Sequence, residues 1–313
     1  MRDRIIAIIG TGLIGQSWAI AFARAGCTVR LFDHLPQAAA RGREDIARTL
    51  RDPVAANLSP GVDAATVIGR IHCAQSLAEA VEGAIHVQEN TPEHLDVKQR
   101  VFAELDAIAD PATVLASSSS ALLPSRFAAG LAGSARCLVA HPLNPPHLIP
   151  AVELVPSPET SADTMARTRA LLGDIGQKPV VLNHEIEGFL MNRLQGALLD
   201  EAFTLVARGV VSVEDVDTAM SAGLGRRWSF MGPFETIDLN APGGVKGFIE
   251  RYGPAYAAIG RERPQRAEWS GDLADTVIAA RRRLLPESEL AARAAWRDAR
   301  LAALAGALND KET

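Results

Sequence analysis

The sequence of 313 residues has few cysteines, no long hydrophobic run and no excess of basic residues. Its three cysteines, Cys27, Cys73 and Cys137, are widely separated, which argues against a disulfide framework and indicates a reducing compartment. No Cys-x-x-Cys or clustered Cys/His spacing occurs, so we expect no metal site. No apolar stretch approaches the roughly 18 residues that a membrane-spanning helix needs.

The balance of charge also excludes some partners. The net charge of -5 and an isoelectric point near 5.8, with scattered basic residues, give no electrostatic reason to bind nucleic acid or an anionic membrane. The first apolar segment breaks at Gly10, which leaves it too short for the hydrophobic region of a signal peptide. We therefore expect a cytoplasmic protein that acts on a small molecule.

Short apolar runs alternate with segments of helical spacing through the first part of the chain. This alternation predicts a Rossmann-type, doubly wound, mainly parallel sheet with helices on both faces. The expected strands are 4–9, 28–32, 71–73, 84–88, 114–116, 137–140, 152–155 and 180–182. The expected helices between them are 16–25, 36–70, 76–81, 92–108 and 162–175.

The pattern changes near Ile186, after which the chain is mostly helical. The length alone suggests two domains. We place the boundary near residue 185, with an α/β domain over 1–185 and a smaller all-α domain over 186–313.

A glycine-rich turn joins the first expected strand to the first expected helix. Gly10, Gly12 and Gly15, with Leu13 and Ile14 between the last two, fit the pattern G-x-G-x-x-G. The first glycine permits a tight turn, the second lets backbone approach a pyrophosphate, and the third lets helix and strand pack closely. The pyrophosphate is favoured at the helix N-terminus by free N–H groups and the helix dipole. We infer a dinucleotide site.

Asp33 ends the second expected strand and indicates which dinucleotide binds. A carboxylate at this position accepts hydrogen bonds from the ribose hydroxyls and repels a 2′-phosphate. The next residue, His34, is not the arginine that would accommodate that phosphate. NAD is therefore favoured over NADP, which remains the alternative.

A histidine and a glutamate follow on two successive expected strands. His141 closes one strand and Glu153 lies within the next, and we expect both at the carboxyl ends of parallel strands, beside the cofactor. A carboxylate next to an imidazole holds its tautomer. Such a pair suits a dehydrogenase, in which a base takes the alcohol proton while hydride leaves carbon.

Taken together, these motifs resemble the L-3-hydroxyacyl-CoA dehydrogenase superfamily. The glycine turn, Asp33, the serines at 117–120, the His141 and Glu153 pair and the segment EGFLMNR at 187–193 occur in its order. Residues 118–122, 140–146 and 223–228 look most like the lambda-crystallin branch, whose activity is that of L-gulonate 3-dehydrogenase. The resemblance covers most of the chain, up to about residue 260.

The resemblance implies catalytic roles for the matching residues. His141 would be the general base in oxidation, and Glu153 would orient it. Ser120 would hydrogen-bond the substrate oxygen. Asn192 would lie at the domain junction and help to hold that oxygen and His141. Asn144 would support the substrate loop near the site.

The resemblance also implies cofactor contacts and a quaternary structure. Glu93 and Lys98 match positions that contact the ribose and the nicotinamide side of NAD. The family pattern favours a homodimer formed through the helical domain.

The identity of the alcohol is left open. Family members that act on acyl-CoA resemble one another in a lysine-rich region after the second strand, whereas residues 36–70 here contain arginines but no lysine. Because Arg also binds phosphate, this difference is suggestive only. A small hydroxy acid needs one cation, and Arg227 could pair with its carboxylate. L-gulonate is our expected substrate. The alternatives are a 3-hydroxyacyl-CoA, L-carnitine, or a non-catalytic NAD-binding role.

Overall fold

The structure is a computed structural model that describes residues 4–51, 63–262 and 271–309. The chain divides into two compact units, of which the first comprises Met1–Arg193 and Trp296–Thr313 and the second comprises Leu194–Ala295. Both boundaries of this division fall inside helices, and the residues from Trp296 onward belong to the first unit. The domain boundary near residue 185 stays a prediction.

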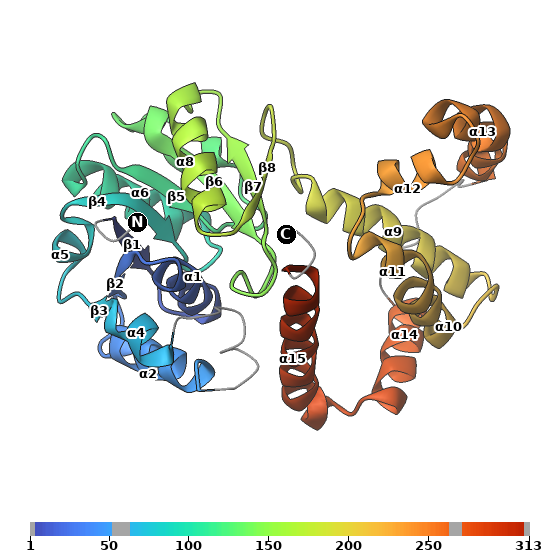
Figure 1. Ribbon diagram of the computed structural model, residues 1–313, viewed down its shortest axis with the longest axis horizontal. Coiled ribbons are helices and arrows are strands. Elements are labelled where there is room, and N and C mark those ends of the chain that lie inside the picture. Colours follow the sequence, from blue (N-terminus) through green and yellow to red (C-terminus); the bar gives the residue numbers. More distant parts are fainter. Residues whose placement is uncertain (1–3, 52–62, 263–270, 310–313) are drawn as a thin grey trace. The chain divides into compact units, whose positions relative to one another are not determined.

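An eight-stranded sheet forms the centre of the first unit, in the order β3-β2-β1-β4-β5-β6-β7-β8 (Figure 1). All neighbouring strands are parallel except β6 and β7. The strands are β1 Ile5–Ile9, β2 Thr28–Phe32, β3 Ile71–Cys73, β4 Ala84–Glu89, β5 Val114–Ser117, β6 Cys137–Pro142, β7 Ala151–Pro156 and β8 Lys178–Val181. The predicted Rossmann-type fold and its mainly parallel sheet are confirmed.

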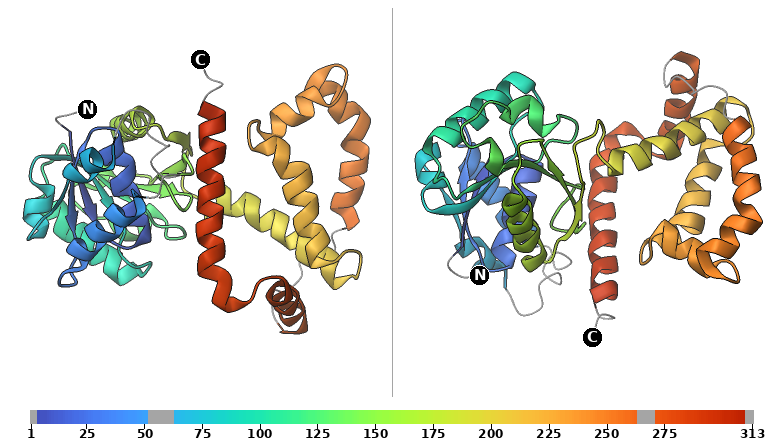
Figure 2. Two further views of the ribbon diagram at one scale, coloured as in Figure 1. Left: turned by 60° about the horizontal axis from the view of Figure 1, so that its bottom comes forward. Right: turned by 90° about the horizontal axis from the view of Figure 1, so that it is seen from above.

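Helices cover both faces of this sheet (Figure 1 and Figure 2). One apolar cluster packs α1, α2, α4 and α8 on one face, and a second packs α5, α6 and α7 on the other. These helices are α1 Leu13–Arg24, α2 Ala38–Thr49, α4 Ala64–Gly69, α5 Leu77–Val81, α6 Leu95–Ile108, α7 Pro124–Ala128 and α8 Ala162–Asp174, with a 3-10 turn, η1, at Ser134–Arg136. Successive β1 residues alternate between the two clusters, since Ile6 and Ile8 belong to the first and Ala7 and Ile9 to the second.

The segment predicted as helical over 36–70 contains α2 and α4, and its residues 52–62 lie outside the described residues. Side chains of α2 form part of the core, with Ile46 fully buried.

The antiparallel pairing of β6 with β7 corrects one expectation. Only residues 143–150 join these strands, and a parallel crossover needs about a dozen residues or more. The chain therefore turns back, and β7 runs opposite to β6. The expectation that His141 and Glu153 lie at the carboxyl ends of two parallel strands is therefore wrong. They are direct partners across the antiparallel pair.

Between β1 and β4 the order of the strands reverses. The chain runs outward from β1 to β2 and β3, and it then returns to place β4 on the other side of β1. In open α/β sheets, ligands bind outside the carboxyl ends of the strands at such a switch point. The glycine turn follows β1 there, and α6 follows β4.

The rest of the described chain is helical, as predicted for the C-terminal domain. The elements are α9 Met191–Ala207, α10 Val213–Thr218, a π-helix, η2, at Ala219–Leu224, α11 Gly225–Trp228, α12 Pro233–Leu239, α13 Gly244–Glu262, α14 Gly271–Leu284, a 3-10 turn, η3, at Glu287–Glu289 and α15 Leu290–Asn309. The chain after residue 260, which the family resemblance did not cover, contains α14 and α15. None of the described helices is both long enough and apolar enough to cross a membrane.

Candidate active site

The three glycines of the first turn meet different physical demands. Gly10 has φ +86°, and a Cβ there would lie 2.7 Å from the carbonyl oxygen of Asn90. A Cβ on Gly15 would lie 2.0 Å from the carbonyl oxygen of Gly10, so only glycine allows α1 to pack this closely on the turn. A Cβ on Gly12 would meet nothing within 4 Å. Gly12 is the N-cap of α1 and therefore leaves open space in front of the helix N-terminus.

Asp33 is bonded to this turn. Its Oδ2 accepts hydrogen bonds from the backbone N–H of Thr11 at 2.8 Å and from the Thr11 hydroxyl at 3.0 Å. Its Oδ1 accepts from the N–H of Leu35 at 3.0 Å. The carboxylate is thus held at the rim of the turn, where it retains lone pairs for further donors.

A cavity of about 850 Å³ opens beside the turn, of a size that suits a cofactor. Its lining includes Gly10, Gly12, Asp33, Asn90 and Thr91. The open N-terminus of α1 can take a pyrophosphate, and the carboxylate of Asp33 can take ribose hydroxyls. These residues fit an NAD molecule. The described residues contain no group of three or more His, Cys, Asp or Glu side chains placed to hold a metal ion.

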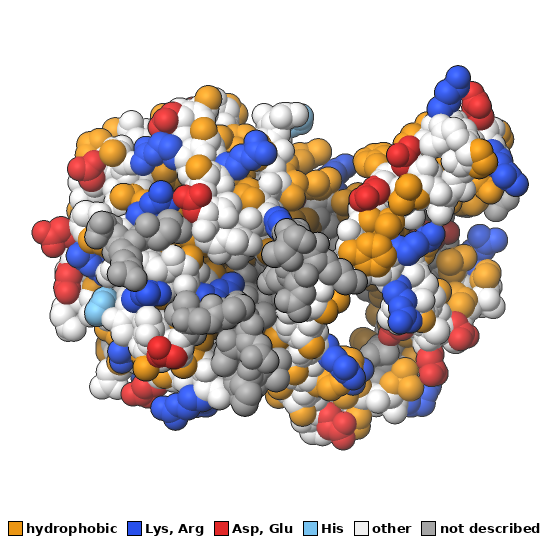
Figure 3. Space-filling view, viewed as in Figure 1, with side chains coloured by type: hydrophobic (Ala, Val, Ile, Leu, Met, Phe, Trp, Pro, Cys, Tyr) orange, Lys and Arg blue, Asp and Glu red, His pale blue; other side chains and the backbone are white. Residues whose placement is uncertain are grey.

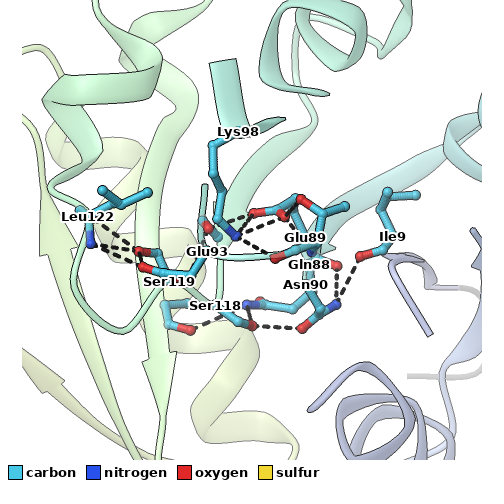
Figure 4. A network of polar contacts seen from close by, with 12 residues as sticks. Ile9, Gln88, Glu89, Asn90, Glu93, Lys98, Ser118, Ser119 and Leu122 are labelled. Atoms are coloured by element: carbon cyan, nitrogen blue, oxygen red, sulfur yellow. Dashed lines mark hydrogen bonds and ion pairs between the residues drawn. The ribbon is translucent and has the colours of Figure 1, made fainter. Parts of the chain in front are cut away.

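Lys98 belongs to a buried ion pair at the end of β4 (Figure 4). Its Nζ donates to both carboxylate oxygens of Glu89 at 2.9 Å and to the carbonyl oxygen of Thr91 at 3.0 Å. The two side chains are 1% and 0% exposed. All three donors of the ammonium group are therefore used within the protein. A contact between Lys98 and the cofactor stays a prediction.

Replacing Lys98 by methionine should lower the free energy of unfolding by about 3–5 kcal/mol, because it leaves the Glu89 charge buried without a cation. Urea denaturation of the purified variant measures this loss. The double variant Glu89→Gln with Lys98→Met is the control, and it should recover part of the stability because no charge stays buried. A Lys98→Met protein as stable as the wild type would contradict the structural role of this pair.

Glu93 binds the loop that follows β5 (Figure 4). One carboxylate oxygen accepts from the Ser119 hydroxyl and from the backbone N–H groups of Ala121 and Leu122, at 3.1 and 3.2 Å. Burial opposes the charged form, but the hydrogen bonds from Ser119 and the two N–H groups outweigh it and lower the pKa of Glu93. Glu93 is therefore an anion that holds the 119–122 loop, and its contact with the cofactor stays a prediction.

Another set of hydrogen bonds joins the ends of β4 and β5 (Figure 4). The Ser118 hydroxyl accepts from Gln88 at 2.8 Å and from the Trp18 indole at 3.1 Å, and it donates to Asn90 at 2.8 Å. Asn90 in turn donates to the carbonyl oxygen of Ile9, next to the glycine turn. Ser118 is thus fully bonded, and it fixes the strand ends that border the cavity.

His141 and Glu153 form a direct buried pair. The distance from His141 Nδ1 to Glu153 Oε2 is 2.7 Å, and the two residues are 5% and 0% exposed. The other carboxylate oxygen, Oε1, accepts from the backbone N–H groups of Leu190 at 2.7 Å and Met191 at 2.9 Å. Glu153 is therefore held from both sides. Because a carboxylate only accepts, a neutral His141 ring paired with it carries its proton on Nδ1 and leaves the lone pair on Nε2.

Ser120 and Asn192 are brought together, but through the backbone of Ser120. The Asn192 side-chain amide donates to the Ser120 carbonyl oxygen at 2.8 Å. Ser120 is exposed, and its hydroxyl makes no hydrogen bond with any residue that the structure describes. That hydroxyl is therefore available to a ligand. Asn144 is also exposed, and the peptide bond that joins it to Pro145 is cis.

Arg227 lies in the second unit, on the short helix α11. It is exposed, and its guanidinium donates a long hydrogen bond of 3.4 Å to Asn240. Its proposed contact with the substrate carboxylate stays a prediction.

Several groups at the site were missed from the sequence. No motif pointed to Glu89, Thr11 or Asn90. A carboxylate at the end of a buried strand, as at Glu89, is nevertheless a signal that could have been used. The N–H groups of Leu190 and Met191 carry no side-chain signal at all.

Comparisons with known proteins show the family of this chain. Residues 5–186 match the model of the NAD-binding domain of 3-hydroxyacyl-CoA dehydrogenase, and residues 188–276 match its C-terminal domain. Lambda-crystallin of Oryctolagus cuniculus is 44% identical over 303 residues, which cover 96% of this chain and 95% of that protein. A 3-hydroxyacyl-CoA dehydrogenase of Gibberella moniliformis is 39% identical over 256 residues, covering 80% and 78%.

A solved structure is similar over almost the full length. It is that of 5-formyl-3-hydroxy-2-methylpyridine 4-carboxylic acid 5-dehydrogenase, described as an NAD+-dependent dismutase. The TM-score is 0.83 at 28% identity, and the match covers 98% of this chain and 99% of that one. With both family models matched and the glycine turn, Asp33 and the His141 and Glu153 pair in place, the chain is an NAD-dependent oxidoreductase that belongs to the 3-hydroxyacyl-CoA dehydrogenase family.

Proposed function

We propose that this protein oxidises the 3-hydroxyl group of a small hydroxy acid, and that L-gulonate, oxidised to 3-dehydro-L-gulonate, is its substrate. The observation that carries the proposal is the pair of His141 with Glu153, which leaves Nε2 with its lone pair and without a hydrogen bond to any described residue. A neutral imidazole in this tautomer is a base ready for an alcohol proton.

The proposed chemistry divides among a few side chains. NAD, when bound, supplies the nicotinamide carbon that accepts the hydride. His141 takes the hydroxyl proton on Nε2, and Glu153 stabilises the imidazolium that forms. The Ser120 hydroxyl donates to the substrate oxygen. Asn192 holds the backbone of Ser120 and helps to hold that oxygen.

The proposal that the substrate is a small acid rests on the contacts that the arginines after β2 make within the protein. The guanidinium of Arg43 donates to the carbonyl oxygens of Ile71 and Ile68, and Arg70 donates to that of Ala23. Arg41 donates to Pro36, and Arg48 pairs with Asp45. These contacts leave fewer free cations for the phosphates of a CoA ester. The structural relative that matches 98% of the chain is also named for a small carboxylic acid.

A steady-state comparison of L-gulonate, L-carnitine and 3-hydroxybutyryl-CoA, each with NAD, tests the proposed substrate. We expect the highest kcat/KM for L-gulonate. A higher value for 3-hydroxybutyryl-CoA would favour the runner-up function, an L-3-hydroxyacyl-CoA dehydrogenase, which the relative from Gibberella moniliformis supports.

Replacing Asp33 by asparagine should reduce the preference for NAD over NADP by about tenfold, because an amide binds ribose hydroxyls less strongly than a carboxylate and does not repel a 2′-phosphate. The ratio of kcat/KM for the two cofactors measures this preference. Asp45→Asn, which changes another carboxylate of the same cavity, is the matched control. Wild-type activity that is higher with NADP than with NAD would refute the role of Asp33.

Replacing Arg227 by alanine should lower kcat/KM for the best hydroxy acid by about tenfold to a hundredfold, the value of one charge-assisted hydrogen bond to a carboxylate. Arg226→Ala, at the neighbouring exposed position, is the control and should leave the kinetics unchanged. If Arg227→Ala changes neither affinity nor rate, the carboxylate is held elsewhere.

The proposed assembly is a homodimer formed through the helical part of the chain. Large apolar side chains are exposed there, and Figure 3 shows hydrophobic side chains between charged ones on its visible face. The exposed large apolar side chains of this part of the chain include Leu198, Leu224, Phe234, Ile249 and Ile278. Exposed apolar surface of this kind is typical of subunit contacts. Gel filtration that gives a monomer at working concentrations would argue against this assembly.

A further inference from the structure

Phe189 has an unusual backbone conformation for a bulky residue. Its φ is +48°, in the left-handed region, and it directly follows Gly188 with φ +76°. Apart from glycine, only Gln37 shares a positive φ among the described residues. A large side chain is disfavoured in this region, and such outliers persist where the surrounding structure holds them and where function uses them.

The ring of Phe189 packs beside the His141 imidazole. The two ring centroids are 5.6 Å apart and the planes are tilted by 56°. Phe189 is 0% exposed and belongs to the apolar cluster on the α6 side of the sheet. One ring nitrogen of His141 is already held by Glu153. The aromatic contact adds a second constraint on the same ring. It limits the tilting of the imidazole about its hydrogen bond to Glu153.

The backbone that leaves Phe189 reaches the other member of the pair. The next two N–H groups, those of Leu190 and Met191, both donate to Glu153 Oε1. The left-handed turn at Phe189 directs them to this one oxygen, at the point where α9 begins. The short segment 188–191 therefore contacts His141 through a side chain and Glu153 through its backbone.

We propose that Phe189 is a positioning residue for the reaction. Its buried ring holds the tilt of the His141 imidazole, and its left-handed backbone aims two N–H groups at Glu153. This inference rests on the proposed role of His141 as the base. A misplacement of a reacting group by about 1 Å can cost on the order of 100-fold in rate.

Phe189→Gly tests the ring separately from the backbone, because glycine adopts the same positive φ without strain. We expect kcat to fall about 100-fold, with KM for the hydroxy acid and the dissociation constant of NAD nearly unchanged. Phe189→Leu keeps apolar bulk and should lose less, about tenfold, so it remains informative if the glycine variant does not fold. Phe127→Ala is the matched control, since Phe127 lies in the same apolar cluster on α7. It should lower stability and leave kcat unchanged.

A double-mutant cycle with His141→Asn shows whether Phe189 acts through His141. In that background Phe189→Gly should cause no further loss of kcat, because the group that it positions is gone. The proposal would be overturned if the losses of kcat in the two single variants multiply in the double variant. It would also be overturned by a wild-type kcat in both Phe189 variants, or by an equal loss of kcat in Phe127→Ala. If His141→Asn keeps full activity, the proposed base is wrong and the positioning role falls with it. A loss in His141→Asn without one in Phe189→Gly refutes the positioning role alone.

Discussion

The His141→Ala variant should lose turnover while it still binds NAD. Loss of a general base typically costs a factor of 10² to 10⁴ in kcat, and here the alcohol proton would have no other acceptor held in place. The cofactor cradle of Gly10, Gly12 and Asp33 does not include His141. The affinity of the variant for NAD should therefore be unchanged. Stopped-flow or steady-state assays give kcat, and a calorimetric titration gives the dissociation constant of NAD.

The control for this variant is His72→Ala, which removes an exposed histidine from β3 and should leave the kinetics unchanged. A His141→Ala protein that turns over at the wild-type rate would overturn the assigned mechanism. One that fails to bind NAD would show that the histidine is needed for the cofactor site instead.

Replacing Glu153 by glutamine should lower kcat by on the order of 10³ to 10⁴-fold. The single amide oxygen of glutamine would keep the two hydrogen bonds from Leu190 and Met191, which turns the NH₂ group toward His141 Nδ1. Nδ1 must then accept, so the ring proton moves to Nε2, where it blocks uptake of the alcohol proton. The same wrong-tautomer effect costs about 10⁴-fold in the Asp–His pair of serine proteases.

Steady-state kinetics of Glu153→Gln test this reasoning, with urea denaturation to show that the variant is folded. Glu159→Gln, a change of an exposed carboxylate shortly after β7, is the control and should behave as wild type. If Glu153→Gln reduces stability but keeps the wild-type kcat in its folded fraction, Glu153 holds the fold and does not set the tautomer.

Much of the fold could be predicted because its signals are local. Each strand of the sheet is a short apolar run bounded by turn residues, and β2 and β3 have the bounds expected from sequence. The glycine turn, its position between strand and helix, and Asp33 depend on about thirty consecutive residues. The direction of β7 was missed, although the short connection over 143–150 contained that information.

The candidate site was less predictable because its contacts join distant parts of the chain. The family resemblance implied a cofactor contact for Lys98, and the structure shows that its ammonium group binds Glu89 and Thr91. Likewise, Asn192 meets the backbone carbonyl of Ser120, 72 residues away in sequence. Neither contact follows from residue type, since it depends on which strand ends and loops the fold brings together.

By itself, the sequence determined the Rossmann-type domain, the use of NAD and the glycine turn with Asp33 at the end of the next strand. These depend on local chain geometry: periodic burial, and glycines where a Cβ would clash. Only the tertiary structure decided how the candidate site residues contact one another. The antiparallel register places His141 opposite Glu153, and the turn at Phe189 supplies Glu153 with two N–H groups. Hydrogen-bond register between distant segments is a property of the packed chain, and for that reason no stretch of sequence encodes it alone.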